Sequence, residues 1–169
     1  MIFGVLGTNS LKTMKIKILS ITSKKNTIFD DVFFQYQKRL PTHIILEHTK
    51  IAMVKRKKNK SIKAAITEEE EALLKHVNSL DAFIVLDETG KQLNSNQFAS
   101  SMNDWMLNGQ NPVFAIGGPD GFSKAIKDKA STILSLSMMT LPHAMVPVML
   151  SEQLYRSWTI LDGQPYHRN

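Results

Sequence analysis

The chain has 169 residues and a formal net charge of +6; 43% of its residues are hydrophobic, and it has no cysteine. This composition is typical of a globular protein, and the length predicts one domain with a substantial core. The lack of cysteine excludes disulfides and thiolate metal sites. No run approaches the roughly 18 apolar residues of a membrane span, and the first residues do not resemble a signal peptide. We therefore expect a cytoplasmic protein with no membrane partner and no metal.

The positive charge is concentrated in the first part of the chain. Residues 1–65 hold 14 Lys and Arg against 3 Asp and Glu, whereas residues 66–169 hold 7 against 12. A basic half of this kind indicates a polyanionic partner, with nucleic acid as the first candidate. The densest basic run, KRKKNK at 55–60, would bind phosphates without sequence preference. A lysine-coated surface and a solvated loop are the alternative interpretations.

The chain begins with a stretch that predicts no structure, residues 1–13. Met14 is followed at once by a strand-like alternation of polar and apolar residues over 15–21. We interpret 1–13 as an N-terminal extension, with Met14 as a candidate for the true start. Residues 14–169 then form a single domain.

The next segments alternate between helical and strand-like patterns. Residues 30–40 have helical spacing, and Pro41 ends that helix. Residues 43–48 predict a second strand, and residues 61–78 predict a second helix. The four glutamates at 68–71 are expected to form the exposed, solvated part of this helix, because adjacent carboxylates point to different helix faces.

Three further segments have the length and branching of buried strands, at 81–86, 112–116 and 131–136. The first two are followed by helical patterns, one capped by Asn94 or Ser95 and one at 122–129. Strands that alternate with helices predict an α/β fold with a mainly parallel sheet and helices on both faces.

The ends of these strands carry the candidate binding loops, LDETGK (86–91), IGGPDG (116–121) and LSLSMMTLPH (134–143). Ligands of open α/β sheets bind beyond the carboxyl ends of the strands. The GGPDG sequence is not GxGxxG and lacks the lysine of a P-loop, which disfavours a dinucleotide or a nucleoside triphosphate. Taken alone, LDETGK and GGPDG each predict a turn, with the glycine of LDETGK at a positive φ.

Two C-terminal motifs complete the pattern, SEQLYRSW (151–158) and PYHRN (165–169). The five motifs, in this order and spacing, resemble the SPOUT-class RNA methyltransferases, specifically the ribosomal large-subunit pseudouridine N3-methyltransferases, over residues 14–169. The resemblance implies a SPOUT fold with a C-terminal deep trefoil knot, S-adenosyl-L-methionine as methyl donor, and a homodimer. It also implies methylation of N3 of a pseudouridine in helix 69 of 23S rRNA on assembled ribosomes.

The resemblance also implies a set of cofactor-binding residues: Leu86, Gly117, Leu136, Ser137, Met138, Met139, Thr140 and Leu141. Apolar Leu and Met side chains can sandwich an adenine, while the N–H and C=O groups of the loop read its polar edge. The alternative is that Leu136, Met138 and Met139 belong to the core.

Residues of the closing segment are implied to bind RNA or to take part in catalysis: His143, Arg156, Tyr166, His167 and Arg168, with Glu152 orienting Arg156. Because the N3 proton of pseudouridine must be lost, a neutral His143 or His167 is a candidate base. Without the resemblance, Glu152 and Arg156 would be a surface pair one helical turn apart, and the tail would be a frayed end.

One position departs from the family pattern. Pro147 stands where the family usually has an arginine, so a cation that would face phosphate or the cofactor carboxylate is missing. Proline is tolerated near a helix start but kinks a helix further along. This departure favours an alternative function, a non-catalytic RNA- or ribosome-binding module. A tRNA methyltransferase is the other alternative.

Overall fold

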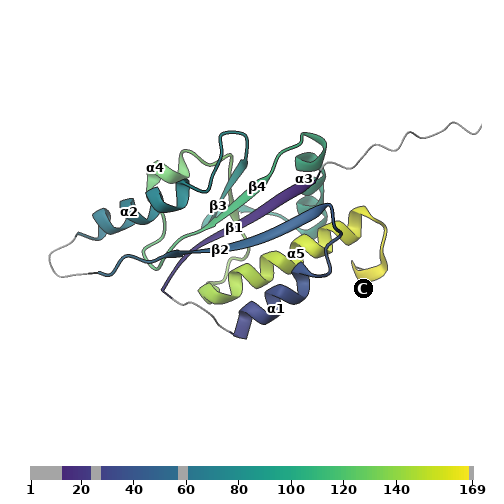
Figure 1. Cartoon of the computed structure of the whole chain (residues 1–169), viewed down its shortest axis with the longest axis horizontal. Helices are drawn as coiled ribbons and strands as arrows, with labels where there is room; N and C mark the ends of the chain where they lie inside the picture. Colours follow the sequence, from purple (N-terminus) through teal and green to yellow (C-terminus); the bar gives the residue numbers. More distant parts are fainter. Residues whose placement is uncertain (1–12, 24–27, 57–60, 168–169) are drawn as a thin grey trace, which may run out of the picture.

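The computed structural model describes residues 13–23, 28–56 and 61–167, which fold around a parallel sheet (Figure 1). Within this part of the chain the sheet has five strands in the order β2-β1-β4-β3-β5, and each neighbouring pair is parallel. The strands are β1 (Met14–Thr22), β2 (Ile44–Ala52), β3 (Ala82–Gln92), β4 (Pro112–Ile116) and β5 (Thr132–Ser135). The helices are α1 (Ile28–Gln37), α2 (Ile62–Leu74), α3 (Ser95–Leu107), α4 (Lys124–Lys127) and α5 (Val146–Leu161), with 3-10 turns η1 (His143–Met145) and η2 (Pro165–His167).

Helices cover both faces of the sheet. On one face α1, α3 and α5 bury Phe33, Met102 and Leu154 against the strands, and on the other α2 and α4 bury Leu73 and Ile126. Figure 1 shows α2 and α4 on the side of the sheet opposite α1 and α5. The predicted α/β architecture is therefore confirmed, while the trefoil knot stays a prediction. No described helix is long and apolar enough to cross a membrane.

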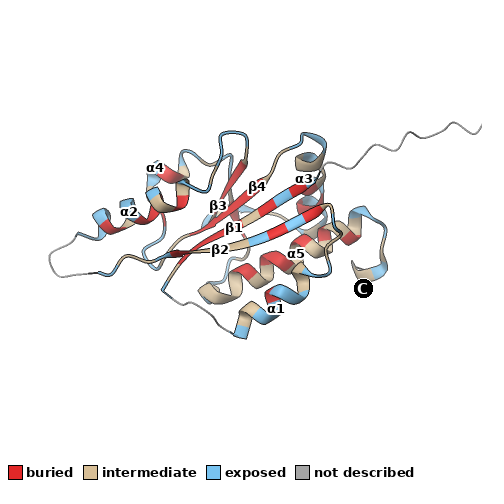
Figure 2. Ribbon diagram, in the orientation of Figure 1, coloured by how far each residue is buried: buried red, intermediate tan, exposed pale blue. Residues whose placement is uncertain are grey.

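Burial along the strands follows this layering (Figure 2). All five residues of β4 are buried, as expected for a central strand covered on both faces. β1 alternates between buried and less buried residues only at its start, because Leu19 and Ile21 pack against the α2 and α4 layer. The alternation predicted over 15–21 therefore holds for the first half of that strand.

The element boundaries differ from the sequence-based expectation in several places. α1 ends at Gln37, before Pro41, and α2 ends at Leu74. β2 continues to Ala52, whereas α4 and β5 are shorter than their predicted ranges. Asn94 caps α3 as predicted: its side chain accepts from the Gln97 N–H, and the Gln97 side chain accepts from the Asn94 N–H.

The glutamates of α2 are not all exposed, so that prediction was wrong for Glu69 and Glu70. Their exposed fractions are 2% and 7%. Glu69 accepts hydrogen bonds from the Val54 N–H (2.7 Å) and from Arg56 (2.6 Å). Glu70 accepts from the N–H (2.6 Å) and the hydroxyl (2.7 Å) of Ser123. These bonds compensate the cost of burying two carboxylates.

LDETGK is not a turn, because β3 continues through it. Leu86 and Lys91 both pair with Leu134 of β5, so the residues between them form a bulge. Gly90 does not have a positive φ, contrary to the prediction. It is required for another reason: a Cβ at this position would lie 2.6 Å from the carbonyl carbon of Leu134.

We predict that Gly90→Ala lowers the free energy of unfolding by about 2–3 kcal/mol, because the new methyl group would overlap the β5 backbone. Urea unfolding followed by circular dichroism measures this. The control is Gly109→Ala, because Gly109 has a φ of +63° and a Cβ added there would have no neighbouring atom within 4 Å. Only left-handed backbone strain of about 1 kcal/mol is therefore expected. A Gly90→Ala cost no larger than that of the control would contradict the steric explanation.

Candidate active site

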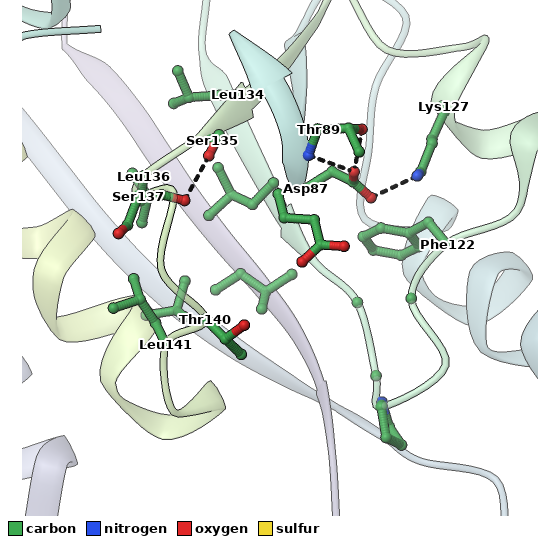
Figure 3. A pocket seen from close by; sticks show the side chains of 18 of the residues that line it. Asp87, Thr89, Phe122, Lys127, Leu134, Ser135, Leu136, Ser137, Thr140 and Leu141 are labelled. Atoms are coloured by element: carbon green, nitrogen blue, oxygen red, sulfur yellow. Dashed lines mark hydrogen bonds and ion pairs between the residues drawn. The ribbon is translucent and has the colours of Figure 1, made fainter. Parts of the chain in front are cut away.

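A cavity of about 540 Å³ lies beside the bulge of β3 and the carboxyl ends of β4 and β5 (Figure 3). Most of its lining comes from three segments that are distant in sequence, 86–89, 116–122 and 134–141, and Lys127 and Val146 complete it. The predicted cofactor-binding residues on these walls are Leu86, Gly117, Leu136, Ser137, Met139, Thr140 and Leu141. Met138 is not among the lining residues, and it is 88% exposed. The structure thus brings together all of the predicted set except Met138.

The loop that follows β5 is braced by two serines. The Ser135 hydroxyl donates to the Ser137 carbonyl (2.9 Å), and the Ser137 hydroxyl accepts from the Met139 N–H (2.9 Å). Figure 3 shows Leu136 and Leu141 facing Asp87 across the cavity. Met139 is 76% exposed, so the interpretation of the two methionines as core residues was wrong. Leu136 is half-buried and packs against the core.

Asp87 is one of three acidic residues that line this cavity, with Glu88 and Asp120. Its carboxylate is 2.6 Å from the Lys127 ammonium and accepts from the N–H (3.1 Å) and the hydroxyl (2.5 Å) of Thr89. Burial alone would raise the pKa of Asp87, but the hydrogen bonds from Lys127 and Thr89 lower it, so the group is ionised at neutral pH. The sequence analysis did not single out Asp87 or Lys127. In the sequence, the position of Asp87 directly after a predicted buried strand could have indicated a role in the site. Nothing in the sequence indicated such a role for Lys127.

The glycine loop after β4 brings backbone to the cavity wall. Gly118 and Gly121 form a bridge, and Gly121 has a φ of 69°. A Cβ at Gly117 would lie 3.2 Å from the carbonyl carbon of Gly121 and from the Phe122 ring. The three glycines of this loop have no side chain to cover their peptide groups, which lets a ligand approach the backbone closely.

Arg56 ties the end of β2 to the glycine loop. Its guanidinium donates to Glu69 (2.6 Å) and to Asp120 (2.7 Å). The hydrogen bonds to Glu69, and then those to Asp120, raise the pKa of Arg56. Arg56 therefore has a structural role within the basic run, while residues 57–60 lie outside the described part of the chain.

His143, at the start of η1, also contacts the glycine loop. Its Nε2 lies 2.8 Å from the Gly117 carbonyl oxygen. A carbonyl oxygen only accepts, so Nε2 carries a hydrogen and donates, which leaves Nδ1 as the proton-accepting nitrogen of the neutral ring. Pro147 follows in the first turn of α5, where its missing N–H breaks no helical bond, and the helix continues to Leu161.

The other polar residues of the closing segment form a separate cluster. Glu152 accepts from Arg156 Nε (2.9 Å) and Nη2 (2.6 Å) and from the Tyr166 hydroxyl (3.2 Å). The Arg156 guanidinium lies 4.9 Å from the centre of the Tyr166 ring. Glu152 thus holds Arg156 as expected, and Tyr166 is docked rather than frayed. The His167 side chain and Arg168 lie outside the described residues.

Each member of this cluster changes the electrostatics of its neighbours. The hydrogen bond to Glu152 raises the pKa of Arg156. Burial, a hydrogen bond with Tyr36 and the charge of Glu152 raise the pKa of Tyr166. Both side chains therefore keep their protons at neutral pH. None of Glu152, Arg156 and Tyr166 lines the cavity at the strand ends.

Comparison with known proteins identifies the family. A family profile described as predicted SPOUT methyltransferase matches residues 14–167. The chain belongs to the SPOUT methyltransferase family. The protein named Ribosomal RNA large subunit methyltransferase H of Francisella tularensis subsp. novicida is 39% identical over 155 residues, covering 92% of this chain and all of that protein. The protein of the same name from Chromobacterium violaceum is 41% identical, covering 92% and 99%.

A solved structure supports the fold assignment. The probable methylase family protein from Haemophilus influenzae Rd KW20 matches with a TM-score of 0.50 at 13% identity, covering 94% of this chain and 72% of that one. At this identity the likeness concerns the fold alone. In the described part of this SPOUT chain, no three His, Asp or Glu side chains gather as ligands for a metal ion.

His48 is a further titratable group near His143, and the sequence analysis did not single it out. Its Nε2 lies 2.8 Å from the Ser20 hydroxyl oxygen. Burial lowers the pKa of His48 first, the charges of Lys50 and His143 lower it further, and Asp30 opposes them, which leaves it at about 4. His48 is therefore neutral at physiological pH.

This pKa predicts how stability depends on pH. In the unfolded chain His48 takes up a proton at its ordinary pKa of 6.5, whereas in the folded chain it does so only at a pKa of about 4. The unfolded state therefore binds more protons between these two pH values, so the free energy of unfolding falls as the pH drops from about 6.5 to about 4. We expect a contribution on the order of 2 kcal/mol to be lost. Urea unfolding at several pH values measures it, with His48→Gln as the comparison. Equal acid sensitivity of the two proteins, or an NMR pKa of His48 near 6.5, would contradict the prediction.

Proposed function

We propose that this chain is an S-adenosyl-L-methionine-dependent methyltransferase that methylates N3 of a pseudouridine in helix 69 of 23S rRNA on assembled ribosomes. The convergence of the three motif segments on one cavity carries the proposal. The chain's relatives, which match over nearly their whole length, are named ribosomal RNA large subunit methyltransferases and support the RNA substrate. The enzyme would act in the cytoplasm, where ribosomes are found.

The residues of the cavity fit this cofactor. The volume of about 540 Å³ is within the range of small-molecule sites, and the lining combines apolar side chains with a few polar groups. Leu86, Leu136 and Leu141 would contact the adenine, and the backbone at Gly117 would approach the ligand closely. Asp87 would accept hydrogen bonds from hydroxyl or ammonium groups. When bound, the cofactor supplies an electrophilic methyl group on a sulfonium.

In this reaction the main contribution of the protein would be to align the nucleophile with the methyl group. Charge disperses in a displacement at a sulfonium methyl, so holding the nucleophile in line contributes most of the rate. The target N3 must also lose its proton. His143 donates from Nε2 to the Gly117 carbonyl, so in the neutral ring Nδ1 is the nitrogen that accepts this proton. His167 is the second candidate base, and a double His→Ala variant with the wild-type rate would exclude both.

A homodimer would complete the site. Within one chain, Glu152, Arg156 and Tyr166 form a cluster that does not line the cofactor cavity. In the proposed dimer, the closing segment of one subunit reaches the cavity of the other and presents Arg156 and the tail to RNA. The pre-formed Glu152–Arg156–Tyr166 contacts fix the geometry of that surface before RNA binds.

Pro147 favours one alternative, a non-catalytic RNA-binding module, because α5 lacks a cation at this position. Lys50 lines a second cavity, beside the first, that Pro147 and His143 also line. Lys50 forms an ion pair with Asp30 at 2.7 Å, so it does not replace the missing cation. The match to relatives named ribosomal RNA large subunit methyltransferases supports the enzyme rather than the non-catalytic module.

The proposed function predicts that S-adenosylhomocysteine raises the melting temperature of the protein. It also predicts transfer of tritiated methyl groups to ribosomes that lack the modification, but not to free tRNA. Gly117→Val should weaken cofactor binding at least about tenfold, because its side chain would crowd the glycine loop and the cavity wall. Isothermal titration calorimetry measures this, with Gly109→Ala as control. Cofactor binding without methyl transfer to any RNA would instead favour the non-catalytic module.

A second prediction concerns the cluster on α5. Glu152→Gln removes the carboxylate that holds Arg156 and Tyr166, so we expect methyl transfer to fall about 10- to 100-fold while cofactor affinity is unchanged. Asp128→Asn is the matched control, because it breaks an exposed pair with Lys124 at the same helical spacing. If the two variants retain the same activity, Glu152 does not orient the RNA-facing groups.

A further inference from the structure

A second cavity, of about 390 Å³, lies beside the first, between the ends of β1 and β2 and the start of α5. Pro119 lines both cavities. His143 lines the second and hydrogen-bonds the carbonyl of Gly117, which lines the first. The two cavities therefore meet at the glycine loop and His143.

This adjacency matters for methyl transfer. Donor and acceptor atoms must approach to about 3–3.5 Å in line before reaction, so the site of the acceptor must adjoin that of the donor. If the first cavity holds the methyl donor, the second is correctly placed for the group that receives the methyl. Its volume is sufficient for a single heterocyclic base.

The lining of the second cavity suits a flat, uncharged ring. Apolar surfaces come from Phe29, Met53, Pro119 and Pro142. The polar side chains on its wall are Ser20, Thr22, Ser23, Asp30, His48, Lys50 and His143. Lys50 and Asp30 form an ion pair at 2.7 Å, so this wall presents balanced charges. A few converging polar groups among apolar walls are typical of small-molecule sites.

Ser20 and His48 form the polar group in this cavity that could hydrogen-bond to a base. The hydroxyl and the imidazole are 2.8 Å apart and stay uncharged at neutral pH. A hydroxyl both donates and accepts, and a neutral imidazole has one donor and one acceptor nitrogen. Because the two groups are hydrogen-bonded to each other, the pair keeps one free donor in either tautomer, which can donate to a carbonyl oxygen of a base, whereas a carboxylate could only accept.

We propose that the second cavity receives the target base, a pyrimidine with an imide edge, and that Ser20 and His48 are specificity-determining residues that hydrogen-bond a carbonyl oxygen beside its N3, which leaves N3 itself free to face the methyl donor. This inference rests on the proposed methyltransferase function. It assigns the base to one subunit's own sheet, while the α5 cluster of the partner subunit contacts the surrounding RNA.

The test separates hydrogen bonding from packing at His48. The imidazole packs on Phe33, with ring centres 5.3 Å apart, so His48→Leu retains an apolar side chain of similar size there. We expect kcat/KM for ribosomes lacking the modification to fall about tenfold or more in His48→Leu and in Ser20→Ala, with partial recovery in His48→Gln. The dissociation constant for S-adenosylhomocysteine should stay within about twofold of wild type. The exposed residues provide the controls His76→Leu and Ser100→Ala.

A binding measurement on the unaltered protein complements the kinetics. With saturating S-adenosylhomocysteine, titration with uridine 5′-monophosphate should shift the imidazole NMR signals of His48 but not those of His76. The base site would be overturned if His48→Leu and Ser20→Ala both kept the kcat/KM of the wild type, or if the His48 signals did not shift. The proposed function would still stand in that case, provided that the wild-type protein methylates ribosomes. An inactive wild-type protein on every RNA would instead overturn the proposed function and this inference with it. If His48→Leu does not fold, Ser20→Ala and the NMR titration decide the question.

Discussion

The close approach of β3 and β5 at Gly90 determines where the cavity lies. A Cβ at Gly90 would meet the Leu134 backbone at 2.6 Å, so only glycine lets the two strands pair across the bulge. The bulge holds Asp87, which meets Lys127 and Thr89 at the polar end of the cavity. The same pairing places the loop after β5 opposite Leu86. The shape of the proposed cofactor site is thus a consequence of one backbone contact.

The glycine loop is then fixed from two sides. Arg56 holds Asp120 from the end of β2, and His143 holds the Gly117 carbonyl from the start of α5. Buried Glu69 anchors Arg56 in turn. Because these contacts involve only groups of the chain itself, the loop is organised before any ligand binds, which lowers the entropic cost of binding. The His143 contact also makes the loop a common wall of both cavities.

Local patterns predicted much of the fold and the position of the main site. β4 was predicted with its observed bounds, and residue type narrowed the cap of α3 to Asn94 or Ser95, of which the structure has Asn94. The motifs located the cavity because the carboxyl ends of parallel strands meet at one edge. Contacts between distant residues were missed: the burial of Glu69, the Asp87–Lys127 pair and the Ser20–His48 pair depend on tertiary packing. Met138 is exposed and does not line the cavity, because sequence does not tell which way a loop side chain points.

We propose that this SPOUT methyltransferase places a methyl group on one nitrogen of one ribosomal base. The most direct measurement is mass spectrometry of nucleosides released from helix 69 of large-subunit RNA, prepared from cells with and without this protein. The account predicts N3-methylpseudouridine only when the protein is present, and its return when the purified protein and S-adenosyl-L-methionine are added to ribosomes from cells that lack it. Identical nucleoside profiles in the two preparations, with no methyl gained on addition of the protein, would contradict it.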